Sequence, residues 1–185
     1  MDLDIVKIYD QFLYSVKYEE ADENEYDRLF QQWNDVENVC QFMEDNSLFL
    51  KNAIWERIVE PEDAARQVLT EACELERLLK KLCENSAKGK KPDLDDHFKY
   101  LEGKYKYELS YEPMKSYGTG RPPLLRMYAI KMGKNVYLIT GGGIKLADTI
   151  QNSPGLKDHV LQNIDRVRRW LKNNGVLDGE DMNEK

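Results

Sequence analysis

The sequence lacks a long apolar run and a recognisable leader. No stretch approaches the roughly 18 to 20 consecutive apolar residues that a membrane-spanning helix needs. The first residues, Met-Asp-Leu-Asp-Ile, are acidic and do not have the basic and apolar regions of a signal peptide. We therefore expect a cytoplasmic protein without membrane partners. The apolar share of 41% and the charged share of 33% are typical of a globular chain with many surface helices.

Metal ligands are scarce. The three cysteines, Cys40, Cys73 and Cys83, show no C-x-x-C spacing, and only His97 and His159 are present to complete a Cys/His cage. Cys40 and Cys73 fall within apolar helical patterns, which favours small buried thiols over a disulfide or a zinc site. We expect no metal and no small-molecule cofactor.

The net charge of −7 conceals two halves of opposite sign. Residues 1–85 carry 9 basic and 21 acidic side chains, whereas residues 86–172 carry 17 basic and 9 acidic ones. A basic half of this kind indicates contact with an anion or an acidic partner. The alternative is that the two halves attract each other within the molecule, and the sequence leaves both readings open.

The N-terminal part of the chain predicts a strand and two long helices. Residues 3–18 are β-branched and aromatic with alternation after Phe12, which predicts an extended segment with a turn or bulge at Asp10-Gln11. Residues 23–84 then predict an antiparallel helical hairpin from two apolar stripes of equal 3-4-3-4-3 spacing. The stripes are Tyr26, Leu29, Trp33, Val36, Cys40 and Met43, followed by Ala65, Val68, Ala72, Leu75, Leu79 and Leu82.

The middle of the chain predicts a β-hairpin. Alternating tyrosines indicate a strand near residues 105–111, and residues 112–123 indicate a mobile basic loop or a sheet edge. Residues 124–131 and 135–140 are strands joined by a tight turn at Gly133. The glycines at 141–143 precede no G-x-x-x-x-G-K-[ST] motif, so they predict a bulge or a close backbone approach rather than a phosphate loop.

The C-terminal part predicts a helix and a free tail. Residues 154–173 carry a stripe of Leu156, Val160, Ile164, Val167 and Leu171, and residues 178–185 are expected to be disordered. The expected fold is α+β over residues 1–177. A small twisted antiparallel sheet, centred on residues 100–146, would be packed by an enlarged N-terminal helical hairpin and the C-terminal helix.

Two short sequence segments in the second half of the chain resemble a known family. Leu-Leu-Arg-Met-Tyr-Ala-Ile and Val-Tyr-Leu-Ile-Thr-Gly-Gly-Gly-Ile-Lys, followed by an arginine-rich helix, resemble the RelE/ParE superfamily of bacterial toxins, in particular its HigB-like branch with related phage proteins. The resemblance covers residues 100–175 in sequence and residues 3–84 in topology. It implies a toxin of a type II toxin–antitoxin system that cleaves mRNA at the ribosome without a metal. A small helix-turn-helix antitoxin would be its partner.

The implied reaction is attack of a ribose 2′-OH on the adjacent phosphate, which needs a base, an acid and cations. Arg126 is the expected phosphate clamp, because a guanidinium donates to two oxygens at once. Lys145 is expected as a second cation or proton donor, and Tyr128 would stack on a base or donate a proton. Each residue also has a purely structural interpretation. Arg126 could form a buried ion pair, Lys145 could be an exposed loop lysine, and Tyr128 could be part of the core. Further cations expected to bind RNA are Lys115, Arg121, Lys131, Arg166 and Arg169.

Two features favour a second hypothesis. The chain is acidic overall, and no histidine lies in the hairpin or directly after it to act as an acid or base. Further along the chain, Asp148 and His159 are the residues that could take that role. The resembling family also includes members that inhibit DNA gyrase rather than cut RNA. The alternative is therefore a non-catalytic interaction module of the same fold.

Overall fold

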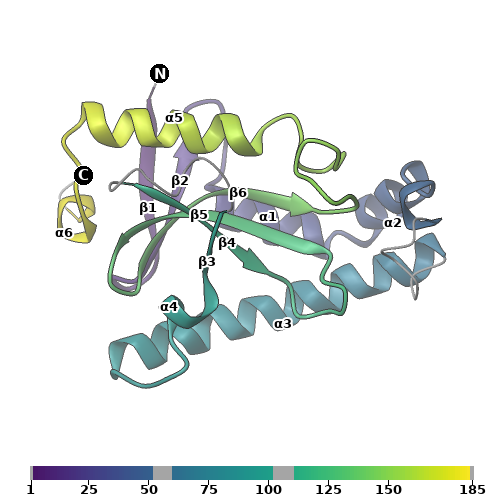
Figure 1. Ribbon diagram of the computed structural model, residues 1–185, viewed down its shortest axis with the longest axis horizontal. Coiled ribbons are helices and arrows are strands. Elements are labelled where there is room, and N and C mark those ends of the chain that lie inside the picture. The colour runs from purple at the N-terminus through teal and green to yellow at the C-terminus, as the bar shows by residue number, and fades with distance from the viewer. Residues whose placement is uncertain (1, 52–59, 102–110, 184–185) are drawn as a thin grey trace.

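The computed structural model describes residues 2–51, 60–101 and 111–183, which form helices around a mixed sheet of six strands (Figure 1). The strands are β1 (Leu3–Tyr9), β2 (Leu13–Tyr18), β3 (Lys99–Tyr100), β4 (Glu112–Tyr117), β5 (Leu125–Gly133) and β6 (Val136–Ile144). The helices are α1 (Glu25–Asn34), α2 (Val36–Asp45), α3 (Pro61–Ala87), α4 (Leu94–His97), α5 (Val160–Asn173) and α6 (Gly179–Met182), with a 3-10 turn at Phe49–Lys51. The strand order is β1-β2-β6-β5-β4-β3.

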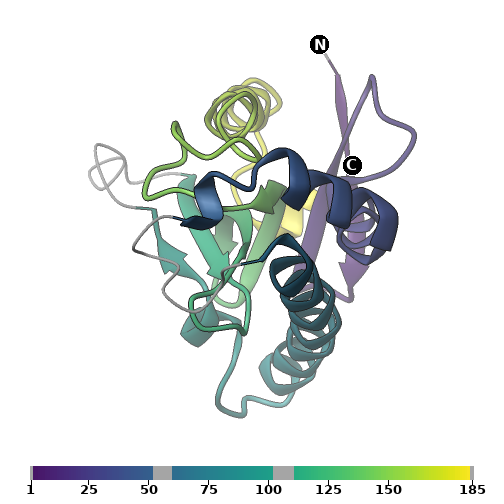
Figure 2. The same ribbon diagram turned by 90° about the vertical axis from the view of Figure 1, so that its right-hand side faces the viewer.

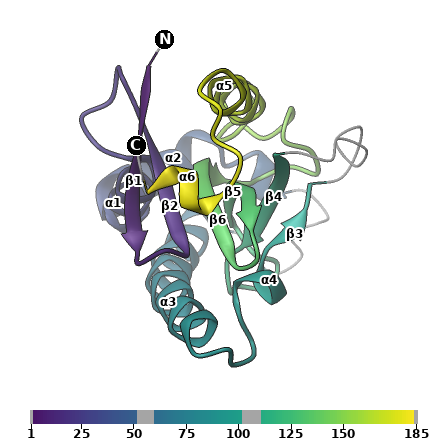
Figure 3. The ribbon, with the colours of Figure 1, turned by 90° about the vertical axis from the view of Figure 1, so that its left-hand side faces the viewer.

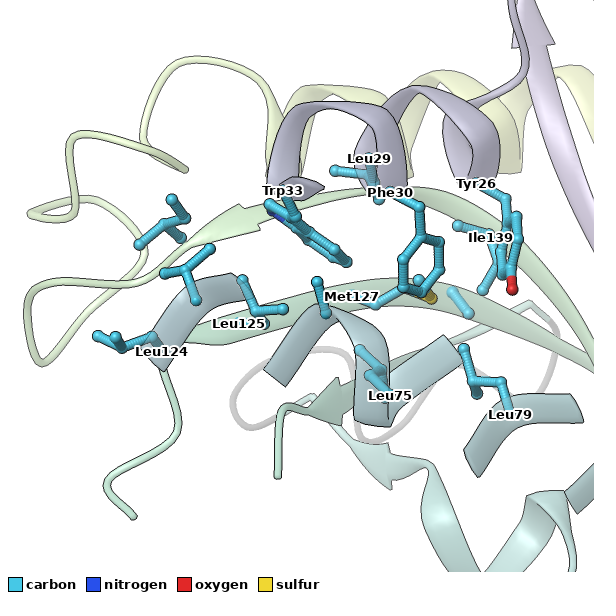
Figure 4. Packing of buried hydrophobic residues seen from close by; sticks show 14 of the residues in the cluster. Tyr26, Leu29, Phe30, Trp33, Leu75, Leu79, Leu124, Leu125, Met127 and Ile139 are labelled. Carbon is cyan, nitrogen blue, oxygen red and sulfur yellow. The ribbon is translucent and has the colours of Figure 1, made fainter. Parts of the chain in front are cut away.

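Helices cover both faces of the sheet, as Figure 2 shows from one end. One face packs against α1, α2 and α3 in the larger apolar cluster, and the other packs against α5 and α6. In Figure 4 the aromatic side chains of α1, including Phe30 and Trp33, point toward Met127 of β5 and Leu75 of α3. This core fixes the sheet between two helical layers.

The expected α+β class is confirmed, but the expected antiparallel sheet is wrong at one strand pair. β2 runs parallel to β6, with Leu13 beside Tyr137 and Ser15 beside Ile139, while the other pairs are antiparallel. Residues 3–18 form a hairpin of β1 and β2, so the turn that the sequence allowed at Asp10-Gln11 is confirmed. Asp10 takes a φ of 47°, a left-handed conformation that aspartate tolerates better than most residues, and the chain reverses there.

The first predicted helix is divided in two at Asp35. The Asp35 side chain accepts a hydrogen bond from the Asn38 N–H and so caps a new helix, α2. The change of direction leaves Val36 57% exposed, so its place in the predicted stripe was wrong, while Trp33 and Met43 are buried as expected. The second stripe is confirmed, because all six of its members on α3 are buried.

The cysteines differ from expectation in one respect. Cys83 is buried and Cys40 is half-buried, but Cys73 is exposed on α3. Cys73 follows Ala72 on the helix and so lies one position off the buried stripe, which directs its side chain outward.

Residues 112–117 form the strand β4, which lies between β5 and β3. Of the two interpretations that the sequence allowed for this segment, a mobile loop and a sheet edge, the structure therefore favours a strand near the edge of the sheet. The strand expected over residues 105–111 lies outside the described residues, apart from Tyr111. The glycines continue β6 to Ile144, and a bulge there lets Tyr128 pair with Gly141 and Ala129 with Ile139.

The predicted close backbone approach is confirmed at these glycines. A Cβ on Gly142 would overlap the Arg126 carbonyl and lie 3.0 Å from Leu29 of α1. A larger residue would therefore separate α1 from the sheet.

The C-terminal region is more ordered than expected. α5 begins at Val160 instead of residue 154, because Gly155 packs against the backbone of Ile144 in a turn that precedes the helix. The predicted disorder is wrong for residues 178–183, which form α6 and its cap. Met182 is 3% exposed, and the Tyr14 hydroxyl donates to Asn183 at 2.9 Å. Among the described helices, none is long and apolar enough to span a bilayer.

This docking predicts a stability contribution from the C-terminal segment. Met182→Ala is expected to lower the free energy of unfolding by roughly 2 to 3 kcal/mol, because a buried side chain is lost. Chemical denaturation followed by circular dichroism measures the change. Leu177→Ala, at a side chain that is 73% exposed, is the matched control and should change stability by less than about 0.5 kcal/mol. Equal effects of the two changes would contradict the docking of α6.

Candidate nucleic-acid interface

Two charged side chains hold the chain segment that leads into β5. The carboxylate of Glu71, 1% exposed on α3, accepts hydrogen bonds from the N–H groups of Leu124 at 2.9 Å and Leu125 at 3.0 Å. Arg126 Nη1 donates to the carbonyls of Pro123 at 3.0 Å and Leu125 at 2.9 Å. The segment is thus bound through its N–H groups by an anion and through its carbonyl groups by a cation.

The loop before this segment is fitted around the same carboxylate. A Cβ on Gly118 or Gly120 would overlap the Glu71 carboxylate, so a larger residue at either position would displace that carboxylate. Gln67, one helical turn before Glu71, donates to it at 2.6 Å and to the Pro122 carbonyl at 2.7 Å. Residues 118–123 are consequently held against α3.

Arg126 is buried rather than open to solvent. It is 8% exposed, and its guanidinium lies 4.2 Å from the ring centroid of Tyr117, its partner on β4. Burial lowers the pKa of Arg126, and the nearby Tyr128, Tyr117 and Glu71 oppose that shift. Within the described residues no carboxylate lies within ion-pair distance of Arg126, so its charge is balanced only at longer range.

The other two expected catalytic residues lie in different surroundings. Tyr128 is 1% exposed in an apolar cluster with Val160 and Ile164 of α5, and burial raises its pKa. Tyr128 is therefore a core residue, which was the alternative to a catalytic role, and its buried hydroxyl has no open path to a substrate. Lys145 is half-buried, and its backbone N–H donates to the Leu124 carbonyl at 2.7 Å. Lys145 and Arg126 therefore lie at the same end of the sheet.

Two of the expected RNA-binding cations are engaged within the molecule. Lys131 pairs with Asp95 at 3.1 Å. Arg166 pairs with Glu20, and its guanidinium lies 4.7 Å from the ring centroid of Tyr18. The hydrogen bond from Arg166 lowers the pKa of Glu20 to about 2. At Arg166 the basic half is attracted to the acidic half, as the intramolecular alternative predicts.

The other three cations are separated between two regions. Lys115 is half-buried on β4 with its Nζ 5.5 Å from the Tyr117 centroid. Arg121 is exposed in the loop that follows, where it donates to the carbonyls of Thr119 and Gly120. Arg169 is exposed on α5 and does not share this surface. Lys115 and Arg121 thus belong with Arg126, and Arg169 does not.

A cavity of about 500 Å³ opens beside Tyr117, at the edge of the sheet where α4, β3 and β4 lie together (Figure 3). We call it the Tyr117 cavity. Lys99 and Arg121 supply its cations, and both are exposed. The cavity is lined by Leu78, Asp96, His97, Lys99, Tyr117, Gly118, Thr119, Arg121 and Pro123.

His97 is the functional candidate that the sequence did not reveal. Its Nε2 lies 2.6 Å from the hydroxyl of Ser116, which is fully buried on β4. Burial, with a smaller effect from the charge of Lys99, lowers the pKa of His97 to about 4, so the ring is neutral at pH 7. In the structure Asp93 caps the short helix α4 that carries His97, and the Ser116 partner lies 19 residues later in the chain, so no local sequence pattern indicates the pair.

The chemistry available here is anion binding next to an aromatic ring and a neutral imidazole. In the part of the chain that the structure describes, no group of three or more His, Cys, Asp or Glu side chains is placed to hold a metal ion. Comparison with family models, with curated proteins and with solved structures finds no match.

The buried carboxylate predicts a large stability effect. Glu71→Ala should lower the free energy of unfolding by about 3 kcal/mol, because the N–H groups of Leu124 and Leu125 lose their acceptor inside the protein. Urea denaturation measures this change. Glu62→Ala, on the same helix with a side chain 82% exposed, should cost less than about 0.5 kcal/mol. A Glu71→Ala protein as stable as Glu62→Ala would contradict the clamp.

His97 predicts a pH-dependent stability. Its folded pKa of about 4 lies below its ordinary value of 6.5, so the unfolded chain binds the proton more tightly. The contribution of His97 is complete above about pH 6.5 and is lost as the pH falls toward 4, at up to about 1.4 kcal/mol per pH unit.

The measurement compares unfolding free energies across this pH range for the wild type and His97→Gln. The difference between the two proteins should change with pH. An NMR titration of the imidazole protons should find the His97 ring still neutral at pH 5. Titration of the His97 ring near pH 6.5 would disprove its burial.

Proposed function

We propose that this protein is the toxin of a type II toxin–antitoxin system, which binds mRNA at the ribosome and cleaves it without a metal ion. The resemblance to RelE/ParE toxins supports this proposal, and so does the placement of cations around Tyr117. A helix-turn-helix antitoxin would be its partner. RNA would enter the Tyr117 cavity, where Lys99 and Arg121 bind phosphates and Tyr117 stacks on a base.

The observation that carries the proposal is the grouping of Tyr117 with several cations. The Arg126 guanidinium lies 4.2 Å and the Lys115 Nζ 5.5 Å from the centroid of the Tyr117 ring, while Lys99 and Arg121 line the adjoining cavity. Proteins that bind single-stranded RNA use this combination, because aromatic rings stack with bases and cations neutralise the RNA backbone.

In the proposed reaction a 2′-oxygen forms a bond to the adjacent phosphorus, and the bond from phosphorus to the 5′-oxygen breaks. A base takes the proton of the 2′-OH, and an acid returns one to the 5′-oxygen. The products are a 2′,3′-cyclic phosphate and a 5′-hydroxyl. Lys99, Arg121 and the potential of Arg126 and Lys145 would stabilise the negative charge on the phosphate oxygens. The neutral His97 would accept the 2′-OH proton.

The second candidate function is a non-catalytic interaction module of the same fold, such as a gyrase inhibitor. It is favoured by the burial of Tyr128 and by the hydrogen bond that already occupies His97 Nε2. In that case the basic surface would bind an acidic protein partner instead of RNA.

The RNA interface is tested by salt dependence. For a Lys99→Ala/Arg121→Ala protein, the slope of log K against log salt for a single-stranded oligoribonucleotide should be smaller in magnitude by about 1.4, because two phosphate contacts are lost. Fluorescence anisotropy at several salt concentrations gives the slope. The matched control is Lys7→Ala/Lys17→Ala on β1 and β2, at the opposite edge of the sheet, which should retain the wild-type slope.

Expression in cells separates the two candidate functions. Growth arrest with transcripts cut inside codons, abolished by Lys99→Ala/Arg121→Ala, is the expected result. Arrest with intact transcripts would reject the nuclease in favour of the interaction module. An unchanged salt slope would reject the Tyr117 cavity as the RNA site.

A further inference from the structure

A second cavity, of about 330 Å³, opens at the same end of the sheet, between α1, α2, the end of β6 and the turn before α5. We call it the Trp33 pocket. Gly142 and Gly143 of β6 line it, and its apolar walls include Trp33 and Phe42. A cavity of this size with apolar walls and a few polar groups is suited to a small planar ring.

Two amide side chains at the pocket have their orientations fixed by charged neighbours. The Gln32 carbonyl oxygen accepts a hydrogen bond from Arg28 Nη1 at 2.9 Å, which leaves its NH₂ as the available group. The Asn38 NH₂ donates to Asp35 at 2.7 Å, which leaves its carbonyl oxygen. Gln32 and Asn38 are exposed, and no hydrogen bond within the described residues uses the Gln32 NH₂ or the Asn38 carbonyl oxygen. The rim of the pocket therefore offers one oriented donor and one oriented acceptor.

The charges around the pocket are already neutralised. Arg28 donates from Nε at 2.8 Å and from Nη2 at 2.6 Å to the two carboxylate oxygens of Glu25, which is 4% exposed. This bidentate pair leaves no unbalanced cation for a phosphate, in contrast to the Tyr117 cavity. His159, whose Nε2 lies 3.3 Å from the Gly142 carbonyl, adds a further polar edge.

We infer that the Trp33 pocket binds a nucleobase of the RNA that the proposed function requires. Each of the four RNA bases has a hydrogen-bond donor beside an acceptor on one edge and is flat and apolar on its faces. The edge would pair with Gln32 and Asn38, and a face would lie against Phe42. This inference rests on the proposed function and adds base recognition to it, separate from phosphate binding.

The placement of the two cavities fits one RNA strand. Arg126 of β5 pairs with Tyr117 of β4 on one side and with Gly143 of β6 on the other. Adjacent strands are about 4.8 Å apart, so β4 and β6 are separated by roughly 10 Å. The Tyr117 cavity and the Trp33 pocket thus lie at the same end of the sheet, where a single RNA strand would reach both.

The test uses the four free nucleosides, which carry no phosphate. Addition of about 1 mM nucleoside to ¹⁵N-labelled full-length protein should shift the NMR signals of the Gln32 and Asn38 side-chain amides and the Trp33 indole for at least one base. Gln32→Ala should weaken that binding about tenfold, because a hydrogen bond to the base is lost. Gln31→Ala is the matched control, since Gln31 is the exposed neighbour that does not line the pocket, and it should stay within about twofold.

A second measurement distinguishes a base in RNA from a free nucleoside as the natural ligand. Gln32→Ala should reduce the differences in affinity among homopolymeric oligoribonucleotides while leaving their salt slope unchanged. Unaltered discrimination would overturn the assignment to RNA, and the absence of shifts with every nucleoside would overturn the pocket itself. Either failure is separable from failure of the proposed function, which would appear as an unchanged salt slope in Lys99→Ala/Arg121→Ala.

Discussion

The burial of the Glu71 carboxylate is the constraint on which the functional end of the sheet depends. A buried carboxylate requires hydrogen bonds from its surroundings, and here the N–H groups of Leu124 and Leu125 provide them. That requirement binds the entry of β5 to α3 and draws the glycine-containing loop over the helix. Tyr117 and Arg121, at either end of that loop, take their positions from it. The buried charge of Glu71, on the opposite side of β5, therefore positions the candidate RNA surface.

The sequence predicted the elements whose residues repeat with a regular period. The α3 stripe and the α5 stripe are buried as expected, because each is set by local helical geometry. The break at Asp35 was missed because the apolar spacing continues through it, although the Asp35 cap opposes a continuous helix. The parallel pairing of β2 with β6 and the docking of Met182 depend on contacts between distant parts of the chain, which no local period encodes.

For the candidate site, the sequence identified cations but not their partners. The burial of Arg126 against Tyr117 depends on the strand β4, in a segment for which the sequence allowed either a loop or a sheet edge. Glu20 and Asp95 neutralise Arg166 and Lys131, and neither pair follows a sequence spacing that could be predicted. The pairing of His97 with Ser116 is a long-range contact of the same kind. Composition shows how many charges exist, whereas the fold determines which remain available.

Under the proposed function, the electrostatics of the two cavities would assign them different parts of an RNA strand, the phosphates to one and a base to the other. At the Tyr117 cavity the exposed cations Lys99 and Arg121 can release counterions when they bind phosphate, which gives affinity without sequence preference. At the Trp33 pocket the Arg28–Glu25 pair cancels its own charge, so binding there must come from shape and from the oriented amides. A donor and an acceptor held in fixed directions discriminate among base edges, whereas a field of positive charge does not. The acidic N-terminal half is then compatible with an RNA-binding role, because its helices contribute the uncharged pocket rather than the phosphate surface.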